Sequence, residues 1–348
     1  MELSPAQLAA FRRDGWLLVP GAFGEEQTRA ARVAMERLYY GDRTFEEWLA
    51  VESSSASDTT TTHVPPELGQ EEHRARFPVG VAALDDLVEH EPFLDIIEQC
   101  MGERAAFCDA HLFLRAGATD RRYPQNKHSG FHMDHNTNCW LPPAPGAAFG
   151  YINATAYLSD VTADCAPMLV CSGSHLAAAA ITSNLTEPGQ PWAASDSGDS
   201  ATYPFVEDIR EVPELSAPVP AVGPAGSCLV YSSYLFHAAQ PFTNKRAQRV
   251  LWSWSCAPAS THPWQTLRSA WSPDERPAMT PFIQGTTPRV RSLFGWPEPG
   301  HAYYTVETLA LLARLFPRMD LAPYYNALVD APMSTSQTER RVSGGSKL

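Results

Sequence analysis

The sequence predicts an α+β protein whose core is mainly β, a sandwich or barrel of short strands flanked by helices. Three observations support this fold class. Apolar residues recur at helical spacing near the N-terminus and again towards the C-terminus. Between them, from about residue 105 to residue 258, short runs of β-forming residues alternate with glycine and proline. The length of 348 residues fits one large domain with insertions.

The first helix is predicted from its capping residues. Ser4 is followed by Pro5, and Gln7 stands three places after the serine, which is the pattern of a capped helix start. Gly15 is expected to end this helix, and a short strand follows it with the sequence "WLLVP". Apolar residues at helical spacing predict further helices over residues 25–41, 91–102 and 306–316.

Six runs are predicted to form the strands of the core: residues 105–117, 130–137, 149–160, 166–175, 226–239 and 249–258. Two segments interrupt the order of elements. Residues 44–77 are rich in serine and threonine and are expected to form a surface insertion. Residues 176–203 are too long and too polar for a simple connection, so we expect a mobile flap. The whole of residues 1–332 is predicted to be a single domain.

Charge and composition narrow the classes of partner. Acidic residues outnumber basic ones, 39 to 26, which argues against a surface for nucleic acid or for an anionic membrane. We therefore expect a small-molecule substrate, and a monomer or homodimer. The seven cysteines form no CxxC pair, so neither a disulfide framework nor a cysteine zinc site is indicated. No apolar run approaches the roughly 18 to 20 residues of a membrane span, and the N-terminus lacks the pattern of a secretory signal.

The last residues carry a separate signal. Residues 333–348 are polar and aperiodic, so they are expected to form a disordered tail. The tail finishes on Ser346, Lys347 and Leu348, a tripeptide that the peroxisomal import receptor reads as an address. We expect a peroxisomal protein if the source is eukaryotic, and a cytoplasmic one otherwise.

The stretch "SGFHMDHNTN" suggests a metal site. Side chains alternate between the two faces of a strand, so His132 and Asp134 are expected to point the same way. A distant histidine on a neighbouring strand would complete a set of two histidines and one carboxylate, and His237 is the candidate. That set with open positions is typical of non-haem Fe(II) oxygenases. His135 is expected to face away from the metal and to be structural or a hydrogen-bond donor. His128 and His175 are likewise expected to make hydrogen bonds rather than to bind the metal.

An iron oxygenase that uses 2-oxoglutarate also needs a buried cation for the far carboxylate of this co-substrate. Arg249 is the first candidate, because it directly precedes the predicted buried strand "VLWSWSC" and an arginine there needs an anionic partner. Arg246 is the alternative. Further candidates for the pocket are Gln125 and Thr155, with Tyr123, Lys127 and Trp140.

With these residues, the chain resembles the phytanoyl-CoA dioxygenase family of Fe(II)/2-oxoglutarate oxygenases. Four segments match the family in order: "LAAFRRDGWLLVPGAF", "FHMD", "AYLSDVTADCAPMLVCSGSH" and "FHAAQPFTNKRAQRVLWSW". The resemblance implies a double-stranded β-helix, a cupin-like jelly roll flanked by helices. It also implies Fe(II), 2-oxoglutarate and O2, with His132, Asp134 and His237 as catalytic metal ligands and Arg249 on the co-substrate.

The reaction implied is oxidation of a C–H bond in a small organic substrate, such as a specialised metabolite or an acyl-CoA. Hydroxylation, desaturation or rearrangement is expected rather than halogenation, because Asp134 fills the ligand position that a halide would need. The chain departs from the family pattern at four places. Ala166 stands where glycine is frequent, Cys171 where proline is common and Ala239 where a hydroxyl residue is frequent, and Arg249 lies one residue further from His237 than expected.

Two other readings of the motif remain open from the sequence. The letters "HMDH" partly match the His-x-His-x-Asp-His motif of binuclear zinc hydrolases, although Gly130 occupies the place of the first histidine. A non-catalytic metal-binding protein on the same fold is the other alternative.

Overall fold

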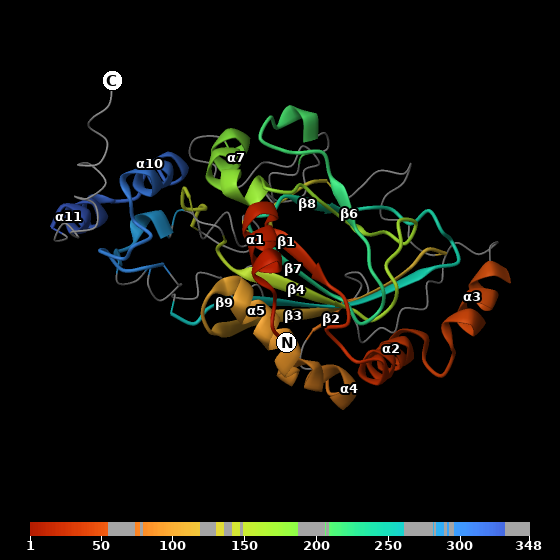
Figure 1. The fold of residues 1–348 in the computed structure, drawn as a ribbon. Helices are drawn as coiled ribbons and strands as arrows, with labels where there is room; N and C mark the ends of the chain where they lie inside the picture. The colour runs from red at the N-terminus through yellow and green to blue at the C-terminus, as the bar shows by residue number, and fades with distance from the viewer. Residues whose placement is uncertain are drawn as a thin grey trace, which may run out of the picture.

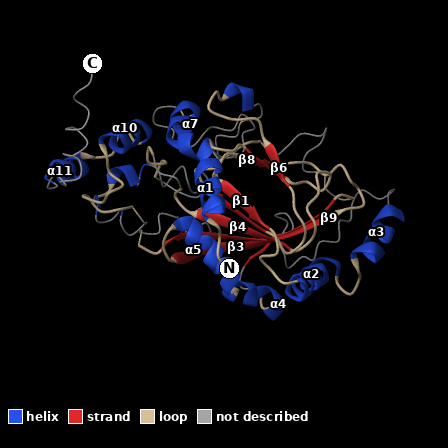
Figure 2. Cartoon of the chain, viewed as in Figure 1, coloured by secondary structure: helices blue, strands red, loops and turns tan. Residues whose placement is uncertain are grey.

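The computed structural model describes residues 1–54, 74–76, 79–118, 130–135, 141–146, 149–186, 206, 209–260, 281, 283–288, 291 and 296–330. Helices and antiparallel strands are mixed, and the strands form two sheets (Figures 1 and 2). The helices are α1 (Pro5–Asp14), α2 (Glu25–Tyr40), α3 (Phe45–Ser54), α4 (Ala82–Asp85), α5 (Glu91–Met101), α7 (Ala178–Leu185), α10 (Val306–Leu315) and α11 (Ala322–Asp330). The strands are β1 (Trp16–Val19), β2 (Arg74–Arg76), β3 (Ala105–Ala116), β4 (Ile152–Tyr157), β5 (Met168–Val170), β6 (Val219–Ala221), β7 (Cys228–Ser232), β8 (His237–Ala239) and β9 (Gln248–Pro258).

The capping residues place α1 as predicted. The Ser4 side chain accepts a hydrogen bond from the Gln7 backbone at 3.3 Å, and the Gln7 side chain accepts one from the Ser4 backbone at 2.9 Å. Gly15 ends the helix with a φ of 81°, in the left-handed region that favours glycine. The predicted helices over residues 25–41, 91–102 and 306–316 are likewise confirmed as α2, α5 and α10.

The large sheet has the strand order β1-β7-β4-β9-β3-β2, and all its neighbouring strands are antiparallel. Alternate residues of β9, among them Val250, Trp252 and Trp254, belong to the main apolar core with residues of α2 and α5. The ring of Phe93 in α5 meets Trp254 edge-on at 4.6 Å. Because side chains alternate along a strand, the residues between these face the other way. That second face of the sheet positions the site.

The small sheet has the order β6-β5-β8. It lies on the side of the large sheet opposite α2, α4 and α5 (Figure 1). In its register Val170 pairs with His237 and Met168 with Ala239. The ring centroid of Tyr231 in β7 lies 5.3 Å from that of His237 in β8, so the second face of the large sheet meets β8 there.

Three predicted strands are wrong in detail. Of residues 166–175 only Met168–Val170 form a strand, and a 3-10 helix begins at Ser174. Residues 130–137 form no regular strand in their described part: Phe131 and His132 make single bridges, and a helical turn follows at Asp134. The run 226–239 is broken into β7 and β8. The Ser232 hydroxyl accepts a hydrogen bond from the Tyr234 backbone at 3.1 Å, which favours a turn over a continuing strand. His237 therefore begins β8, whereas the predicted run 226–239 placed it near the end of one long strand.

The segments predicted to be irregular contain helices. The insertion 44–77 begins with α3, and the flap 176–203 begins with α7. Helix α11 was not predicted at all. Residues 55–73, 187–205 and 331–348 lie outside the described residues, so the tail and its Ser346-Lys347-Leu348 ending stay predictions.

A second apolar cluster holds the C-terminal helices. It contains Leu309, Leu312, Phe316 and Tyr324, together with Leu141 from the segment that follows the metal motif. Two side chains bind this C-terminal part to the rest of the protein: Tyr303 donates to the Pro142 carbonyl at 2.9 Å, and Arg314 donates to the Thr186 carbonyl at 2.6 Å. Among the helices that the structure describes, none combines the length and the apolar character of a membrane span.

Candidate metal centre

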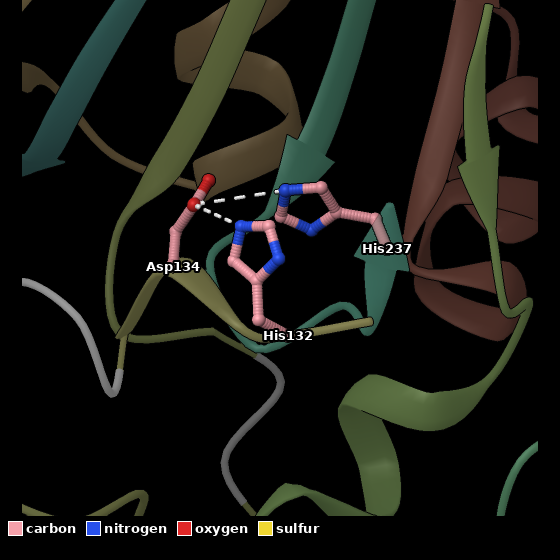
Figure 3. A group of neighbouring side chains, drawn as sticks. All are labelled: His132, Asp134 and His237. Atoms are coloured by element: carbon pink, nitrogen blue, oxygen red, sulfur yellow. Dashed lines mark ion pairs between the residues drawn. The ribbon is translucent and has the colours of Figure 1, made fainter. Parts of the chain in front are cut away.

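Three side chains from two distant parts of the chain, residues 132–134 and residue 237, converge on one point (Figure 3). The Nε2 atoms of His132 and His237 each lie 3.6 Å from Oδ1 of Asp134. One ligand atom from each residue lies within 4.8 Å of the other two. Since metal bonds to histidine nitrogen and carboxylate oxygen are about 2 Å long, this spacing suits a single ion. The convergence predicted from the sequence is therefore present.

The backbone brings the two histidines together. His132 and His237 exchange two backbone hydrogen bonds of 2.9 Å, as a directly opposed antiparallel pair does. Side chains of such a pair lie next to each other, and the two ring centroids are 4.5 Å apart. A single β-bridge therefore brings the two histidines together, whereas the sequence predicted a pair of complete strands for this.

Both imidazoles are held in the tautomer that a metal needs. His132 directs Nδ1 to the Gly130 carbonyl at 3.2 Å, and His237 directs Nδ1 to the Leu235 carbonyl at 2.9 Å. A carbonyl oxygen only accepts, so Nδ1 carries the proton and Nε2 carries the lone pair that can bind a metal. Burial also lowers the pKa of His237 below its ordinary value, although Asp134 has an opposing effect. The lowered pKa favours the neutral ring. The donor set therefore fits an Fe(II) ion.

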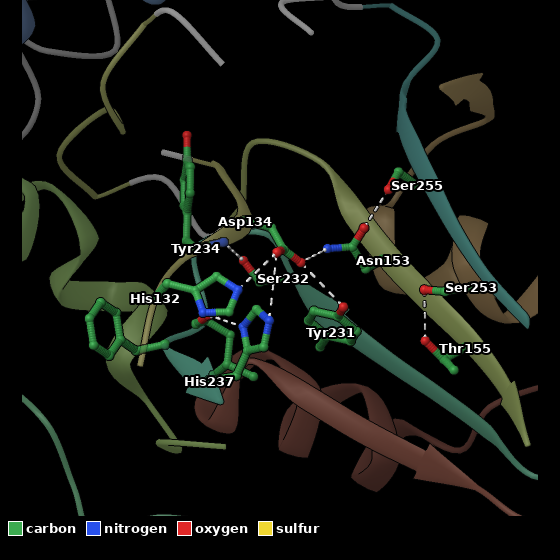
Figure 4. A network of polar contacts seen from close by, with 12 residues as sticks. His132, Asp134, Asn153, Thr155, Tyr231, Ser232, Tyr234, His237, Ser253 and Ser255 are labelled. Carbon is green, nitrogen blue, oxygen red and sulfur yellow. Dashed lines mark hydrogen bonds and ion pairs between the residues drawn. The ribbon is translucent and has the colours of Figure 1, made fainter. Parts of the chain in front are cut away.

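Asp134 is held from the large sheet. Its Oδ2 atom accepts hydrogen bonds from the Asn153 amide at 2.7 Å and from the Tyr231 hydroxyl at 3.2 Å (Figure 4). The Ser255 hydroxyl donates to the other end of the Asn153 amide at 2.5 Å. Sequence reasoning missed all three of these residues. The available signal was the polar residues at alternate positions of the apolar runs "INATAY" and "LWSWSC".

The structure distinguishes the two candidate arginines. Arg249 is buried near the start of β9, and its Nη1 atom donates to the carbonyl of Ala166. Arg115 of β3, which the sequence did not suggest, is also buried and lies directly beside Arg249 in the register of the two neighbouring strands. Arg246 is exposed and lies 3.8 Å from Glu46 on the surface. Arg249 is thus the better placed of the two for a buried carboxylate.

The other predicted residues have different positions. Thr155 is buried in β4, and its hydroxyl lies 2.9 Å from that of Ser253. His175 lies outside the cluster and bonds through Nε2 to the Arg12 carbonyl at 3.1 Å. The remaining candidates lie outside the described residues: Tyr123, Gln125, Lys127, His128 and Trp140.

His135 does not take part in the cluster. Its Nε2 atom lies 2.7 Å from the Leu141 carbonyl, and burial lowers its pKa to about 4. A binuclear zinc site would need the Asp134 and His135 side chains on a second metal. With His135 directed to Leu141, the arrangement does not favour that reading.

The protein combines mixed helices and antiparallel sheets with a site of two histidines and one carboxylate. This donor set is that of non-haem Fe(II) oxygenases. The chain belongs to the family described as Phytanoyl-CoA dioxygenase (PhyH), whose sequence profile matches residues 11–250. The resemblance inferred from the motifs is thereby confirmed. As a member of this family it is a 2-oxoglutarate-dependent oxygenase, with iron and 2-oxoglutarate as cofactors.

Several solved structures are similar to the chain. EctD from S. alaskensis, in its apo form, is 18% identical with a TM-score of 0.49, over 76% of this chain and 82% of that chain. HygX from Streptomyces hygroscopicus, with nickel and 2-oxoglutarate bound, is 17% identical with a TM-score of 0.44, over 75% and 88%. The epimerase SnoN, in complex with Fe3+, alpha ketoglutarate and nogalamycin RO, is 17% identical with a TM-score of 0.46, over 73% and 83%. No curated protein sequence matches the chain.

Proposed function

We propose that this protein oxidises a C–H bond of a small organic substrate, using Fe(II), 2-oxoglutarate and O2. The reaction is hydroxylation, or desaturation or rearrangement. The observation that carries the proposal is the convergence of His132, Asp134 and His237 on one point, with both imidazoles in the metal-binding tautomer. We also propose that the two antiparallel sheets form the double-stranded β-helix of cupin-like jelly rolls.

The residues of the chain have separate tasks in this proposal. His132, Asp134 and His237 hold the metal, and Arg249 pairs with the far carboxylate of 2-oxoglutarate through its two-pronged guanidinium. Thr155 lies on the same face of the large sheet as Arg249 and contributes a hydroxyl to the co-substrate pocket. When bound, the metal would let O2 oxidise two partners at once: 2-oxoglutarate, which is converted to succinate and CO2, and the C–H bond of the substrate. The protein supplies position and exclusion of water.

The presence of Asp134 argues for these outcomes and against halogenation. A carboxylate ligand occupies the position where a halide would have to bind. The net charge of −13 gives no support to a cluster for the phosphates of coenzyme A. We therefore propose a specialised metabolite as the substrate, with an acyl-CoA as the alternative that the substrate screen decides.

The test uses purified protein with Fe(II), 2-oxoglutarate and O2, and measures succinate release in a screen of acyl-CoAs, terpenoids, polyketides and amino acids. We expect at least one compound to stimulate succinate release by the wild type, and Asp134→Ala to abolish that stimulation. Full stimulated turnover by Asp134→Ala would contradict the proposal. So would a wild-type protein that binds iron tightly and consumes no 2-oxoglutarate with any compound.

A further inference from the structure

The two oxygens of Asp134 have different surroundings. Oδ1 lies 3.6 Å from Nε2 of both histidines, whereas Oδ2 faces away from them and accepts from Asn153 and Tyr231. Figure 4 shows these contacts on the side of Asp134 that faces the large sheet. The two hydrogen bonds fix the rotation of the carboxylate about its bond to Cβ.

Asn153 is itself fixed in one orientation. A carboxylate oxygen only accepts, so the amide nitrogen of Asn153 must face Asp134 and its oxygen must face Ser255. The Asn153 residue is almost fully buried, at 3% exposure. If its amide rotated, water could not replace the hydrogen bonds that it would lose. The hydroxyl of Ser255 donates to the amide oxygen, so both ends of the amide are hydrogen-bonded.

The sheet register makes this arrangement rigid. Asn153 of β4 is the direct partner of Ser255 in β9 on one side and of Tyr231 in β7 on the other. The three residues therefore form one row across three adjacent strands, the central strands of the large sheet. Asp134 stands in a helical turn outside any strand, while the two histidines hold each other through their backbone bridge. Asp134 is thus the ligand that depends on side chains for its position.

We propose that Asn153, held by Ser255 and assisted by Tyr231, is a positioning residue that makes Asp134 a ligand through Oδ1 alone. This inference rests on the metal site of the proposed function. Two histidines and one carboxylate oxygen leave three positions of a six-coordinate ion open, and 2-oxoglutarate and O2 need these positions. A carboxylate free to turn can bind through both oxygens and close one of them.

Co(II) binding without 2-oxoglutarate and without O2 tests the proposal, because it needs no turnover. Affinity is measured by competition with a chromophoric chelator, and the visible absorption of bound Co(II) reports the number of ligand atoms. We expect Asn153→Ala to weaken Co(II) binding by about 10- to 100-fold, the usual effect of losing a group that orients a metal ligand. The absorption of bound Co(II) should change as well.

Three further variants separate position from folding. Tyr231→Phe removes only the hydroxyl and keeps the packing, and we expect a smaller loss of Co(II) affinity. Ser255→Ala has a matched control in Ser253→Ala, since both serines lie on the same face of β9 but Ser253 contacts Thr155 and not Asn153. We expect Ser255→Ala to weaken Co(II) binding and Ser253→Ala to leave the Co(II) affinity and absorption of wild type.

The outcomes separate this inference from the proposed function. If Asp134→Ala binds Co(II) as well as wild type does, the metal site itself is wrong. If Asp134→Ala loses binding while Asn153→Ala and Tyr231→Phe match wild type in affinity and absorption, only the positioning role is wrong. Equal effects of Ser253→Ala and Ser255→Ala would also overturn it, because a general loosening of β9 would then explain both.

Discussion

The carbonyl of Ala166 accepts a hydrogen bond from Nη1 of Arg249, the arginine that we propose for the far carboxylate of 2-oxoglutarate. Ala166 has a φ of 48° and is the one non-glycine residue with a positive φ in the part of the chain that the structure describes. Its side chain is fully buried. A residue with a side chain is strained in this left-handed region, and Ala166 is held there.

Because of this strain, the stability of the protein should depend on the shape of the side chain at position 166. We expect Ala166→Val to lower the free energy of unfolding by about 2 kcal/mol, because a β-branched residue is disfavoured at positive φ and has no room in a packed interior. Ala166→Gly should stay within about 1 kcal/mol of wild type, since relief of strain offsets the lost methyl group. Urea unfolding measures both. Equal stability of Ala166→Val and wild type would contradict the backbone conformation at this site.

The two arginine candidates can be separated by conservative substitution. Arg249→Lys keeps the charge but loses the two-pronged geometry, so we expect the affinity for 2-oxoglutarate to fall at least about tenfold, or about 1.4 kcal/mol. Arg246→Lys is the control, because Arg246 is exposed and its contact with Glu46 is a surface ion pair. Calorimetric titration of 2-oxoglutarate into the Mn(II)-loaded protein measures both affinities. A stronger effect of Arg246→Lys would reverse the assignment.

Gly15 is required at the end of α1 for two reasons, its conformation and its neighbour. A Cβ added there would lie 2.5 Å from Nδ1 of His175. Gly21 also has a positive φ, of 68°, but an added Cβ would meet nothing within 4 Å. We expect Gly21→Ala to cost about 1 kcal/mol of unfolding free energy from backbone strain alone, and Gly15→Ala about 2 kcal/mol more. Thermal or urea unfolding measures the difference, and similar losses would show that His175 does not pack there.

His175 should make stability depend on pH. Burial lowers its pKa below the ordinary value, an effect larger than the opposing ones of the Arg12 carbonyl and Asp14. Between its lowered pKa and about 6.5 the unfolded chain binds the proton and the folded protein does not. The contribution of His175 is therefore complete above about pH 6.5 and is lost as pH falls through the lowered pKa.

The check for His175 is urea unfolding at pH 7.5 and at pH 5.5, for wild type and for His175→Gln. Other buried histidines titrate in both proteins, so the difference between the two slopes isolates His175. We expect the unfolding free energy of the variant to fall less between the two pH values. An equal or larger fall in His175→Gln would contradict the lowered pKa.

Local signals in the sequence were sufficient where an element depends on its own residues. The capping residues Ser4 and Gln7 and the glycine that follows α1 predicted its bounds. The apolar run of β9 was identified because every residue of this strand is buried or half-buried. In contrast, the break between β7 and β8 is a turn in which the hydroxyl and the carbonyl of Ser232 accept hydrogen bonds from the backbone of Tyr234 and Leu235. Nothing in the apolar pattern of residues 226–239 reveals that choice.

The same division holds for the site. The identity of His132, Asp134 and His237 followed from residue types and motif order, and the structure brings them together. Their expected support, a regular strand carrying His132 and Asp134, is absent from the described residues 130–135. Asn153, Tyr231 and Ser255 could not be predicted to meet, because strand register and strand order, which set their neighbours, are not written in local sequence.

The pairing of β1 with β7 has a consequence for synthesis on the ribosome. Trp16 pairs with Tyr231, so the N-terminal strand emerges about 200 residues before its partner does. At roughly 5 to 20 residues per second, its apolar edge waits on the order of 10 to 40 seconds for that partner. Nascent chains that end before β7 therefore expose an unpaired strand, and they are the species from which chaperone capture or aggregation would start.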